Sequence, residues 1–299
     1  MANNPTVLLL NKEADQTSFS FLGPIKKLID PKVGHTGTLD RFATGLMIVL
    51  TGPLTKLNTL FSNLDKTYLA TVRFGCETDT LDPEGKVIAT APIPKLETVE
   101  KVLKKHFSGI ISQHPPQYSA IHVKGERAYR LARQGQRFSM PTRDVEIFDT
   151  QILGYNQGDL KIKIHCSKGT YIRAIARDLG ELCGSKGHLT KLQRIAIGPY
   201  CIEESVGADD YPNLRNHAIE SVDRLLRLPQ LGQMAIDKES SRRFCYGNLP
   251  DKNSVISRKL KNGDKYAALF TEEGLFIGVI AVDKQQNPLK VISVACSRQ

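Results

Sequence analysis

Hydrophobic and polar residues along the chain alternate with periods typical of both strands and helices. Apolar runs or strict alternation, as in buried or half-buried strands, occur at 7–10, 46–50, 68–74 and 160–166. Apolar spacings of three and four, as on the buried side of a helix, occur at 54–64, 98–107 (with Thr98 as N-cap) and 172–182. The two kinds of element mix without the regular alternation of a doubly wound parallel sheet. We therefore expect an α+β fold with a long mixed, mostly antiparallel sheet.

The pattern changes after about residue 230. Short apolar segments separated by turns follow, among them 266–270 and 278–282 with Asn262-Gly263-Asp264 before them. We expect a main domain over 1–229 and a small β-rich domain over 230–299. The alternative is a β-hairpin extension that only covers the main domain.

Composition favours a polyanionic partner. The 299 residues include 41 Lys plus Arg and 31 Asp plus Glu, a net charge of +10. Basic residues gather between 117 and 143, where Lys124 and Arg133 are two of six, and between 161 and 200, where there are eight. We expect both clusters to contact phosphates, because neutralising a phosphate releases condensed counterions. A solvated surface is the alternative for each cluster.

Other sequence features exclude several classes of protein. The chain has no apolar run of eighteen residues, no signal peptide at its N-terminus, and no phosphate-binding or dinucleotide-binding glycine motif. Its six cysteines are scattered without a C-x-x-C pair, and no histidine pair has metal-ligand spacing. We expect a cytoplasmic protein with reduced thiols, no metal and no cofactor.

One carboxylate lies in a glycine-rich turn at 34–46, GHTGTLDRFATGL. It belongs to Asp40, the only acidic residue between Asp30 and Asp65. Glycines allow a tight turn and a close approach of the backbone to a ligand. From its position alone, Asp40 is either a capping residue or a nucleophile presented to a ligand.

This loop resembles the signature loop of the TruB-type pseudouridine synthases, which act on uridine 55 in the T loop of transfer RNA. Three later segments resemble further motifs of the family in the same order: 66–68 (KTY), 115–120 (PPQYSA) and 165–173 (HCSKGTYIR). The resemblance implies a pseudouridine-synthase catalytic domain whose insert at 117–143 clamps RNA. It also implies that the β-rich segment is an RNA-binding domain of the PUA-like type. A monomer that needs no protein partner is expected.

The resemblance also implies three catalytic residues. Asp40 is the nucleophile, attacking either C6 of the base or C1′ of the sugar. Tyr68 stacks on the target base and is a candidate for removing the C5 proton, although a tyrosine in mid-strand is more often a core residue. Arg173 pairs with Asp40 and keeps it ionised, although an arginine in a first helical turn usually faces solvent.

Further residues are expected to bind the substrate. Tyr171 lies beneath the target base, Leu192 forms part of the pocket wall, and His35 holds the bases disturbed when the uridine leaves its stack; a local hydrogen-bonding role is the alternative for His35. Lys12 is the residue of the family's N-terminal motif that this chain keeps, while Arg41, His122 and the segment 11–18 depart from the family pattern.

Two other functions remain open from the sequence. One is the catalytic subunit of a guide-RNA particle, which shares the aspartate loop but needs a guide and partner proteins. The other is an RNA-binding or RNA-folding protein with secondary catalysis. The leading hypothesis is a stand-alone, cofactor-free pseudouridine synthase acting on the T-arm stem-loop of transfer RNA.

Overall fold

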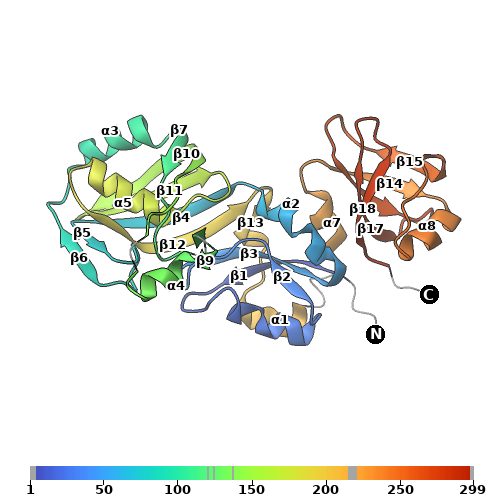
Figure 1. Ribbon diagram of the computed structural model, residues 1–299, viewed down its shortest axis with the longest axis horizontal. Helices are drawn as coiled ribbons and strands as arrows, with labels where there is room; N and C mark the ends of the chain where they lie inside the picture. Colours follow the sequence, from blue (N-terminus) through green and yellow to red (C-terminus); the bar gives the residue numbers. More distant parts are fainter. Residues whose placement is uncertain (1–4, 120, 124, 137, 215–220, 297–299) are drawn as a thin grey trace.

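The computed structural model of the chain describes residues 5–119, 121–123, 125–136, 138–214 and 221–296. In this part of the chain a nine-stranded sheet has the order β1-β3-β12-β4-β11-β10-β7, with β2 beside β3 and β13 beside β12 (Figure 1). Its strands are β1 (Val7–Lys12), β2 (Val33–His35), β3 (Thr44–Thr51), β4 (Lys66–Phe74), β7 (Gly109–Gln113), β10 (Arg143–Asn156), β11 (Asp159–Cys166), β12 (Gly187–Ile197) and β13 (Tyr200–Cys201). Its pairs are antiparallel except β12 with β3. The predicted α+β class is confirmed.

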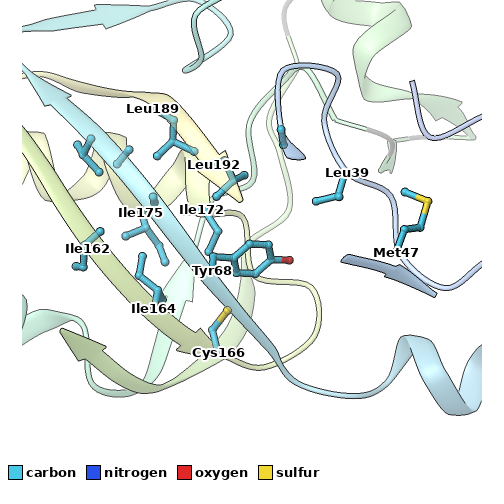
Figure 2. Packing of buried hydrophobic residues seen from close by; sticks show 14 of the residues in the cluster. Leu39, Met47, Tyr68, Ile162, Ile164, Cys166, Ile172, Ile175, Leu189 and Leu192 are labelled. Carbon is cyan, nitrogen blue, oxygen red and sulfur yellow. The ribbon is translucent and has the colours of Figure 1, made fainter. Parts of the chain in front are cut away.

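Strand β4 lies inside this sheet and carries the alternation expected from the sequence. Ala70 and Val72 are buried on one face, in a cluster that includes residues of helices α3 (Leu96–His106) and α5 (Ile172–Leu182). Figure 2 shows Ile172 and Ile175 of α5 close to the side chains of β4 and β11. Burying such a side chain contributes about 1.5–3 kcal/mol, so the apolar stripe of α5 fixes that helix on the sheet.

The other helices among the described residues are short. They are α1 (Gly23–Leu28), α2 (Asn58–Ser62), α4 (Ala128–Arg133), α7 (Ser221–Leu226), α8 (Lys238–Cys245), and 3-10 turns at Ser20–Leu22, Gly52–Leu57, Ile202–Glu204, Ala208–Asn213 and Lys252–Ser254. No helix formed by the described residues is long and apolar enough to cross a membrane.

Two predicted helix boundaries are wrong. Helix α3 begins at Leu96, and the Thr98 N–H already binds the Lys95 carbonyl at 3.1 Å, so Thr98 lies inside the first turn and is not the N-cap. The helix expected over 54–64 is a 3-10 turn that starts at Gly52 and leads into α2.

Leu182, expected in the buried stripe of α5, is 48% exposed because it lies in the last turn.

The two longest strands of the described chain, β10 and β12, were not predicted. Each contains two irregularities of register, for example between Ile152 and Gly154 in β10 and between Leu189 and Lys191 in β12. A bulge inserts one residue into a strand and breaks the period of two on which the sequence prediction relies.

A second sheet follows the main one, as the change of pattern after residue 230 predicts. Its five strands are β15 (Val255–Lys259), β14 (Leu231–Ile236), β16 (Tyr266–Phe270), β17 (Phe276–Val282) and β18 (Pro288–Val294), in that spatial order. Ala268 and Val279 of this sheet share a hydrophobic cluster with Val7 and Leu9 of β1. The two sheets are therefore joined by a packed interface, whereas the domain division at 229/230 stays a prediction.

The expectation that all thiols are reduced is wrong for Cys245 and Cys296, which form a disulfide. They are 51 residues apart in the sequence, with Cα atoms 5.6 Å apart. The pair has no local sequence motif, because the fold of the second sheet brings the end of α8 to the segment after β18. The other four cysteines are free.

Gly45 allows strands β3 and β12 to approach each other. Its φ is +112°, and a Cβ there would lie 2.3 Å from the Arg194 carbonyl oxygen. The parallel pairing of Gly45 with Arg194 joins the β1-β3 edge to the rest of the sheet. A side chain at position 45 would therefore force the two strands apart.

We predict that Gly45→Ala lowers the free energy of unfolding by about 2–4 kcal/mol, because both the backbone angle and the space exclude a methyl group. Urea unfolding followed by circular dichroism measures this change. The control is Gly154→Ala on β10, where a Cβ has nothing within 4 Å and the midpoint should stay within about 0.5 M. Equal midpoints for the two variants would contradict the prediction.

Candidate active site

A pocket of about 690 Å³ lies where the glycine-rich loop, strands β4 and β12 and the start of α5 meet. Its lining includes Asp40, Tyr68, Tyr171, Arg173 and Leu192. These five residues are spread over more than 150 positions of the sequence, and the sheet order brings them together. Figure 2 shows Tyr68, Ile172, Leu192 and Leu39 around this part of the sheet.

Asp40 and Arg173 form the ion pair that the sequence analysis predicts. Nη2 of Arg173 donates to Oδ1 of Asp40 at 2.9 Å. The Arg173 side chain is 5% exposed, whereas the Asp40 side chain is 35% exposed. The guanidinium is thus fixed inside the protein while the carboxylate stays accessible from the pocket. The capping role considered for Asp40 has no support, because its carboxylate is directed to Arg173.

A second carboxylate, Asp82, also contacts Arg173 and was missed in the sequence analysis. Its Oδ2 lies 3.3 Å from Nη1 of Arg173, and its Oδ1 accepts from Oγ1 of Thr80 at 2.6 Å and from the Glu84 N–H at 3.1 Å. It lies in the loop between β5 (Cys76–Thr78) and β6 (Val87–Thr90), away from any recognised motif. The sequence signal is weak, because Asp82 is a loop aspartate with only Thr80 and Glu84 as polar neighbours, each two positions away.

Both terminal nitrogens of Arg173 also bind backbone carbonyls, whereas its buried Nε has no hydrogen-bond partner among the described residues. Nη1 donates to the Thr80 carbonyl at 2.9 Å and Nη2 to the Tyr118 carbonyl at 3.0 Å. Arg173 therefore ties the β5–β6 loop and the start of the 117–143 segment to the first turn of α5. The solvent-facing alternative for Arg173 is wrong, since a guanidinium with four partners is buried here.

Opposing effects act on the carboxyl group of Asp40. Burial raises its pKa, the Arg173 charge lowers it, and the nearby Asp82 charge raises it, with a net direction above the ordinary value. Such a carboxylate is a stronger base and nucleophile than one in water. The Arg173 contact still favours its ionised form in the pocket.

Tyr68 lies across from Arg194 in the β4–β12 ladder, and their side chains share a face of the sheet. Arg194 is 1% exposed; its Nε donates to the Leu46 carbonyl at 2.8 Å and its Nη2 to the Gly37 carbonyl at 3.0 Å. Burial raises the pKa of the Tyr68 hydroxyl, and the Arg194 charge opposes that rise. Tyr68 is both a core residue, 9% exposed, and part of the pocket lining.

Arg194 was not predicted as a site residue, although its spacing from Leu192 indicates that the two side chains share a face of the strand. Leu192, predicted in the pocket wall, and Arg194 are two positions apart on one strand and therefore lie on the same face. Arg194 was instead counted among eight basic residues at 161–200 that were expected to form one phosphate-contacting surface.

The expectation that the eight basic residues at 161–200 form one surface is wrong. Arg173 and Arg194 are buried, and Arg177 and Lys186 pair with acidic residues. Lys161 lies opposite Thr71 in the β11–β4 ladder. Tyr68 and Ala70 face the core, and Thr71 is one position further along β4, so Thr71 and Lys161 lie on the other face of the sheet. The strand period of two thus divides the cluster between two faces.

Tyr171 is the N-cap residue of α5 and is held through its backbone. Its N–H donates to Oε1 of Gln113 at 2.8 Å, and its carbonyl accepts from Nε2 of Gln113 at 3.1 Å. The Arg143 guanidinium lies over its ring, 5.7 Å from the centroid. Gln113 therefore fixes the orientation of a ring that lines the pocket, and Leu192 completes the apolar wall.

His35 also lines the pocket, on β2. Burial and then the charge of Arg194 lower the pKa of its imidazole, so the ring is neutral at pH 7. Its backbone carbonyl accepts from Nδ2 of Asn58 at 2.7 Å, and its Nδ1 faces the Gly37 N–H at 3.4 Å. Both the local hydrogen-bonding role and a contact with a ligand are compatible with this position.

Lys12, predicted to bind substrate, lies outside the lining of the pocket. Its side chain is buried, does not line the pocket, and donates to the carbonyls of Glu13 (2.7 Å), Gln16 (2.8 Å) and Arg41 (3.2 Å). Burial lowers its pKa to about 8. An ammonium group has three donors, all used here, so Lys12 fixes the 13–16 turn against the residue that follows Asp40.

Of the two basic residues proposed in the 117–143 segment, Arg133 lines the pocket and Lys124 lies outside the described residues. The segment contains β8 (His122–Val123), β9 (Glu126–Arg127) and α4, which carries Arg133 in its last turn. Tyr118, Ser119 and Tyr129 of this segment also line the pocket. It therefore forms one wall of the site.

Among the described residues, no group of three or more His, Cys, Asp or Glu side chains could hold a metal ion. The pocket instead offers the partly accessible carboxylate of Asp40, the fixed guanidinium of Arg173 and several aromatic rings, among them Tyr68 and Tyr171. Such a set can supply a nucleophile and a stacking surface for a flat ring.

The chain is similar to known proteins in sequence and in fold. Residues 26–172 match the family model for the N-terminal domain of TruB family pseudouridylate synthase. The tRNA pseudouridine synthase B of Borreliella afzelii is 48% identical over 277 residues, covering 91% of this chain and 93% of that protein. That of Francisella philomiragia is 41% identical over 236 residues, covering 78% and 76%. A chain in the crystal structure of a Cbf5-Nop10-Gar1 complex has the same fold, with a TM-score of 0.70 at 20% identity, covering 98% of this chain and 85% of that chain.

We predict that Asp82→Asn lowers the pKa of Asp40, because it removes a negative charge that disfavours a second one nearby. Carboxyl ¹³C NMR titration of Asp40 measures this change. The control is Glu84→Gln, which removes an exposed charge from the same loop and should leave the Asp40 titration unchanged. A higher pKa of Asp40 in the Asp82→Asn protein would contradict the prediction.

Proposed function

The chain belongs to the TruB family of pseudouridylate synthases and is an isomerase of transfer RNA, and we propose that it converts the uridine at position 55 in the T loop into pseudouridine. The observation that carries this proposal is the Asp40–Arg173 pair at 2.9 Å, open to a pocket lined by Tyr68, Tyr171 and Leu192. These are the side chains that the resemblance assigns to catalysis and to holding the target base.

The proposed reaction uses Asp40 as the nucleophile. Its carboxylate oxygen bonds to the nucleotide, at C6 of the base or at C1′ of the sugar, and the bond between N1 and C1′ breaks. The freed uracil turns, C5 bonds to C1′, and the bond to the Asp40 oxygen breaks, which restores the carboxylate. The C5 proton leaves to solvent and N1 takes up a proton, so atoms and charge balance without a cofactor. Only ionised Asp40 can attack. Because its pKa is raised, turnover should fall, as the pH drops, at a higher pH than for an ordinary aspartate.

We propose that Tyr68 stacks on the target base. Burial raises the pKa of its hydroxyl, which makes a phenolate base costly at neutral pH. Tyr171 closes the other side of the base, and Arg173 keeps the attacking oxygen of Asp40 in place. An apolar wall that excludes water strengthens the Asp40–Arg173 attraction.

The target uridine must leave its stack to reach Asp40, and we propose that it is flipped into the pocket. Extrusion costs a few kcal/mol and costs less when the base already lies in a loop. A pocket of about 690 Å³ is within the range of small-molecule sites and can enclose one nucleotide. His35 would then contact the bases left behind.

The remaining contacts with RNA are assigned to the rim and to the second sheet. Arg133 and Arg143 line the pocket and would contact phosphates beside the target. We propose that residues 230–299 form a PUA-like RNA-binding domain next to a catalytic domain over 1–229, and that the 117–143 segment clamps the RNA. We propose a monomer that acts without a protein partner or guide, with Asp40, Tyr68 and Arg173 all supplied by one chain.

We predict that Asp40→Asn lowers pseudouridine formation by more than about 10³-fold, because the amide cannot act as a nucleophile, while RNA affinity changes less than about threefold. Tritium release from a T-arm stem-loop labelled at C5 of uridine measures turnover, and filter binding measures affinity. The matched control is Asp144→Asn, an exposed aspartate on β10 outside the pocket.

Turnover in the Asp40→Asn protein would contradict the nucleophile role. A substrate with cytidine at position 55 should release no tritium from its other labelled uridines, and release from them would contradict the assigned position. A strict need for a guide RNA would instead identify the protein as a subunit of a guide-RNA particle.

We predict that Arg133→Ala reduces the slope of log affinity against log salt concentration by roughly 0.7–0.9, the loss of one phosphate contact. Affinity for the stem-loop at several salt concentrations measures the slope. The control is Lys161→Ala, an exposed residue on the opposite face of the sheet, which should leave the slope unchanged. Equal effects of the two substitutions would contradict the assigned RNA surface.

A further inference from the structure

Phe19 is the most exposed large hydrophobic side chain among the described residues, at 76%. It also lines the pocket that holds Asp40, which no other exposed large hydrophobic residue of the described chain does. A phenyl ring left in water at the entrance of a binding pocket has apolar surface available for a ligand.

The backbone under Phe19 is fixed to the catalytic loop. Oγ of Ser18 accepts from the Leu39 N–H at 2.9 Å and donates to the Leu39 carbonyl at 3.0 Å. Phe19 directly follows Ser18, and Leu39 directly precedes Asp40. Two hydrogen bonds therefore join the residue before Phe19 to the residue before Asp40.

The turn that carries Phe19 is also anchored on its other side. Phe21 and Leu22 are 3% and 4% exposed, and the Phe21 N–H binds the Thr17 carbonyl at 3.1 Å. Phe19 thus extends from a fixed backbone while its neighbours fill the core. A rigid aromatic residue loses little conformational entropy when a ligand contacts it.

A cation lies beside the ring. Nζ of Lys26 is 4.8 Å from the centroid of Phe19. Arg41, which follows Asp40, lines the same pocket, as do Arg133 and Arg143. An aromatic ring among cations fits a nucleic acid, whose bases stack and whose phosphates attract the cations.

We propose that the Phe19 ring is a stacking platform for an unpaired nucleobase next to the uridine held in the pocket, with Lys26 directed at the phosphate of the stacked nucleotide. This inference rests on the proposed function, because it takes the pocket's occupant to be a uridine in an RNA loop. It adds a second recognised base, outside the pocket, to the one that reacts.

The chain contains no tryptophan, so Phe19→Trp places a single indole on the proposed platform. In an Asp40→Asn background, which prevents turnover, we expect the T-arm stem-loop to quench the indole fluorescence. The quenching should saturate with the same midpoint as the anisotropy of a labelled stem-loop. Binding seen by anisotropy without quenching would overturn the proposal.

The matched control is Phe148→Trp in the same background. Phe148 is 46% exposed and does not line the active-site pocket. Its fluorescence should not change with RNA, and equal quenching of both proteins would overturn the proposal, since it would indicate RNA covering the surface without a specific stack.

Two further variants separate stacking from general hydrophobic contact. Phe19→Ala and Phe19→Leu should each bind the stem-loop about tenfold more weakly than the unaltered chain, because neither presents a ring. Full affinity in the Phe19→Leu protein would overturn the proposal. Stem-loops that each lack one loop base should include one that binds the unaltered chain as weakly as the intact RNA binds Phe19→Ala.

Tritium release by the unaltered chain tests the proposed function separately. Turnover without quenching in the Phe19→Trp protein would refute the platform and leave the reaction in place. Quenching without turnover by the unaltered chain would refute the reaction and leave a base-stacking RNA site.

Discussion

The site depends on one buried positive charge. Arg173 is 5% exposed, and a guanidinium so far from water needs anions and carbonyls to replace its lost hydration, which they do at both of its terminal nitrogens. Its partners are carboxylates of Asp40 and Asp82 and carbonyls of two loops. Removing one partner of a buried ion pair typically costs about 3–5 kcal/mol, so the same contacts that orient Asp40 also hold the loops against α5.

The ladder between β4 and β12 supplies the second constraint. It sets Tyr68 opposite Arg194, and the guanidinium of Arg194 then reaches back to the carbonyls of Gly37 and Leu46. The loop that carries Asp40 is therefore bonded to the strand that faces Tyr68. Gly45 makes this possible, since a side chain there would overlap the Arg194 backbone. Sheet register thus determines the distance between the Asp40 carboxylate and the Tyr68 ring.

The sequence was informative where a period or a motif was intact. The alternation of apolar and polar residues predicted strands β4 and β11, and the motif resemblance predicted Asp40, Tyr68 and Arg173 as site residues. Prediction failed where a bulge interrupted the period, as in β10 and β12, and where a side chain acts through partners distant in the sequence. Asp82 has no motif of its own, and Lys12 matched a motif but is buried on backbone carbonyls. In these cases the structure depends on contacts between residues far apart in the sequence, and the local pattern of residues does not indicate such contacts.

The charges in the site suit a neutral ring attached to an anionic chain. Arg173 with Asp40 and Asp82 carries one net negative charge, and Arg194, with no acidic partner among the described residues, carries one positive charge beside Tyr68. The buried ammonium of Lys66, bonded to the Ser62 and Leu64 carbonyls, also lines the pocket, so these inner groups together carry one net positive charge. Further basic residues of the lining are Arg41, Arg133 and Arg143. The basic residues of the lining attract a phosphodiester chain, and the apolar space beside Tyr68 accepts an uncharged ring, as the proposed reaction at a uridine within RNA requires.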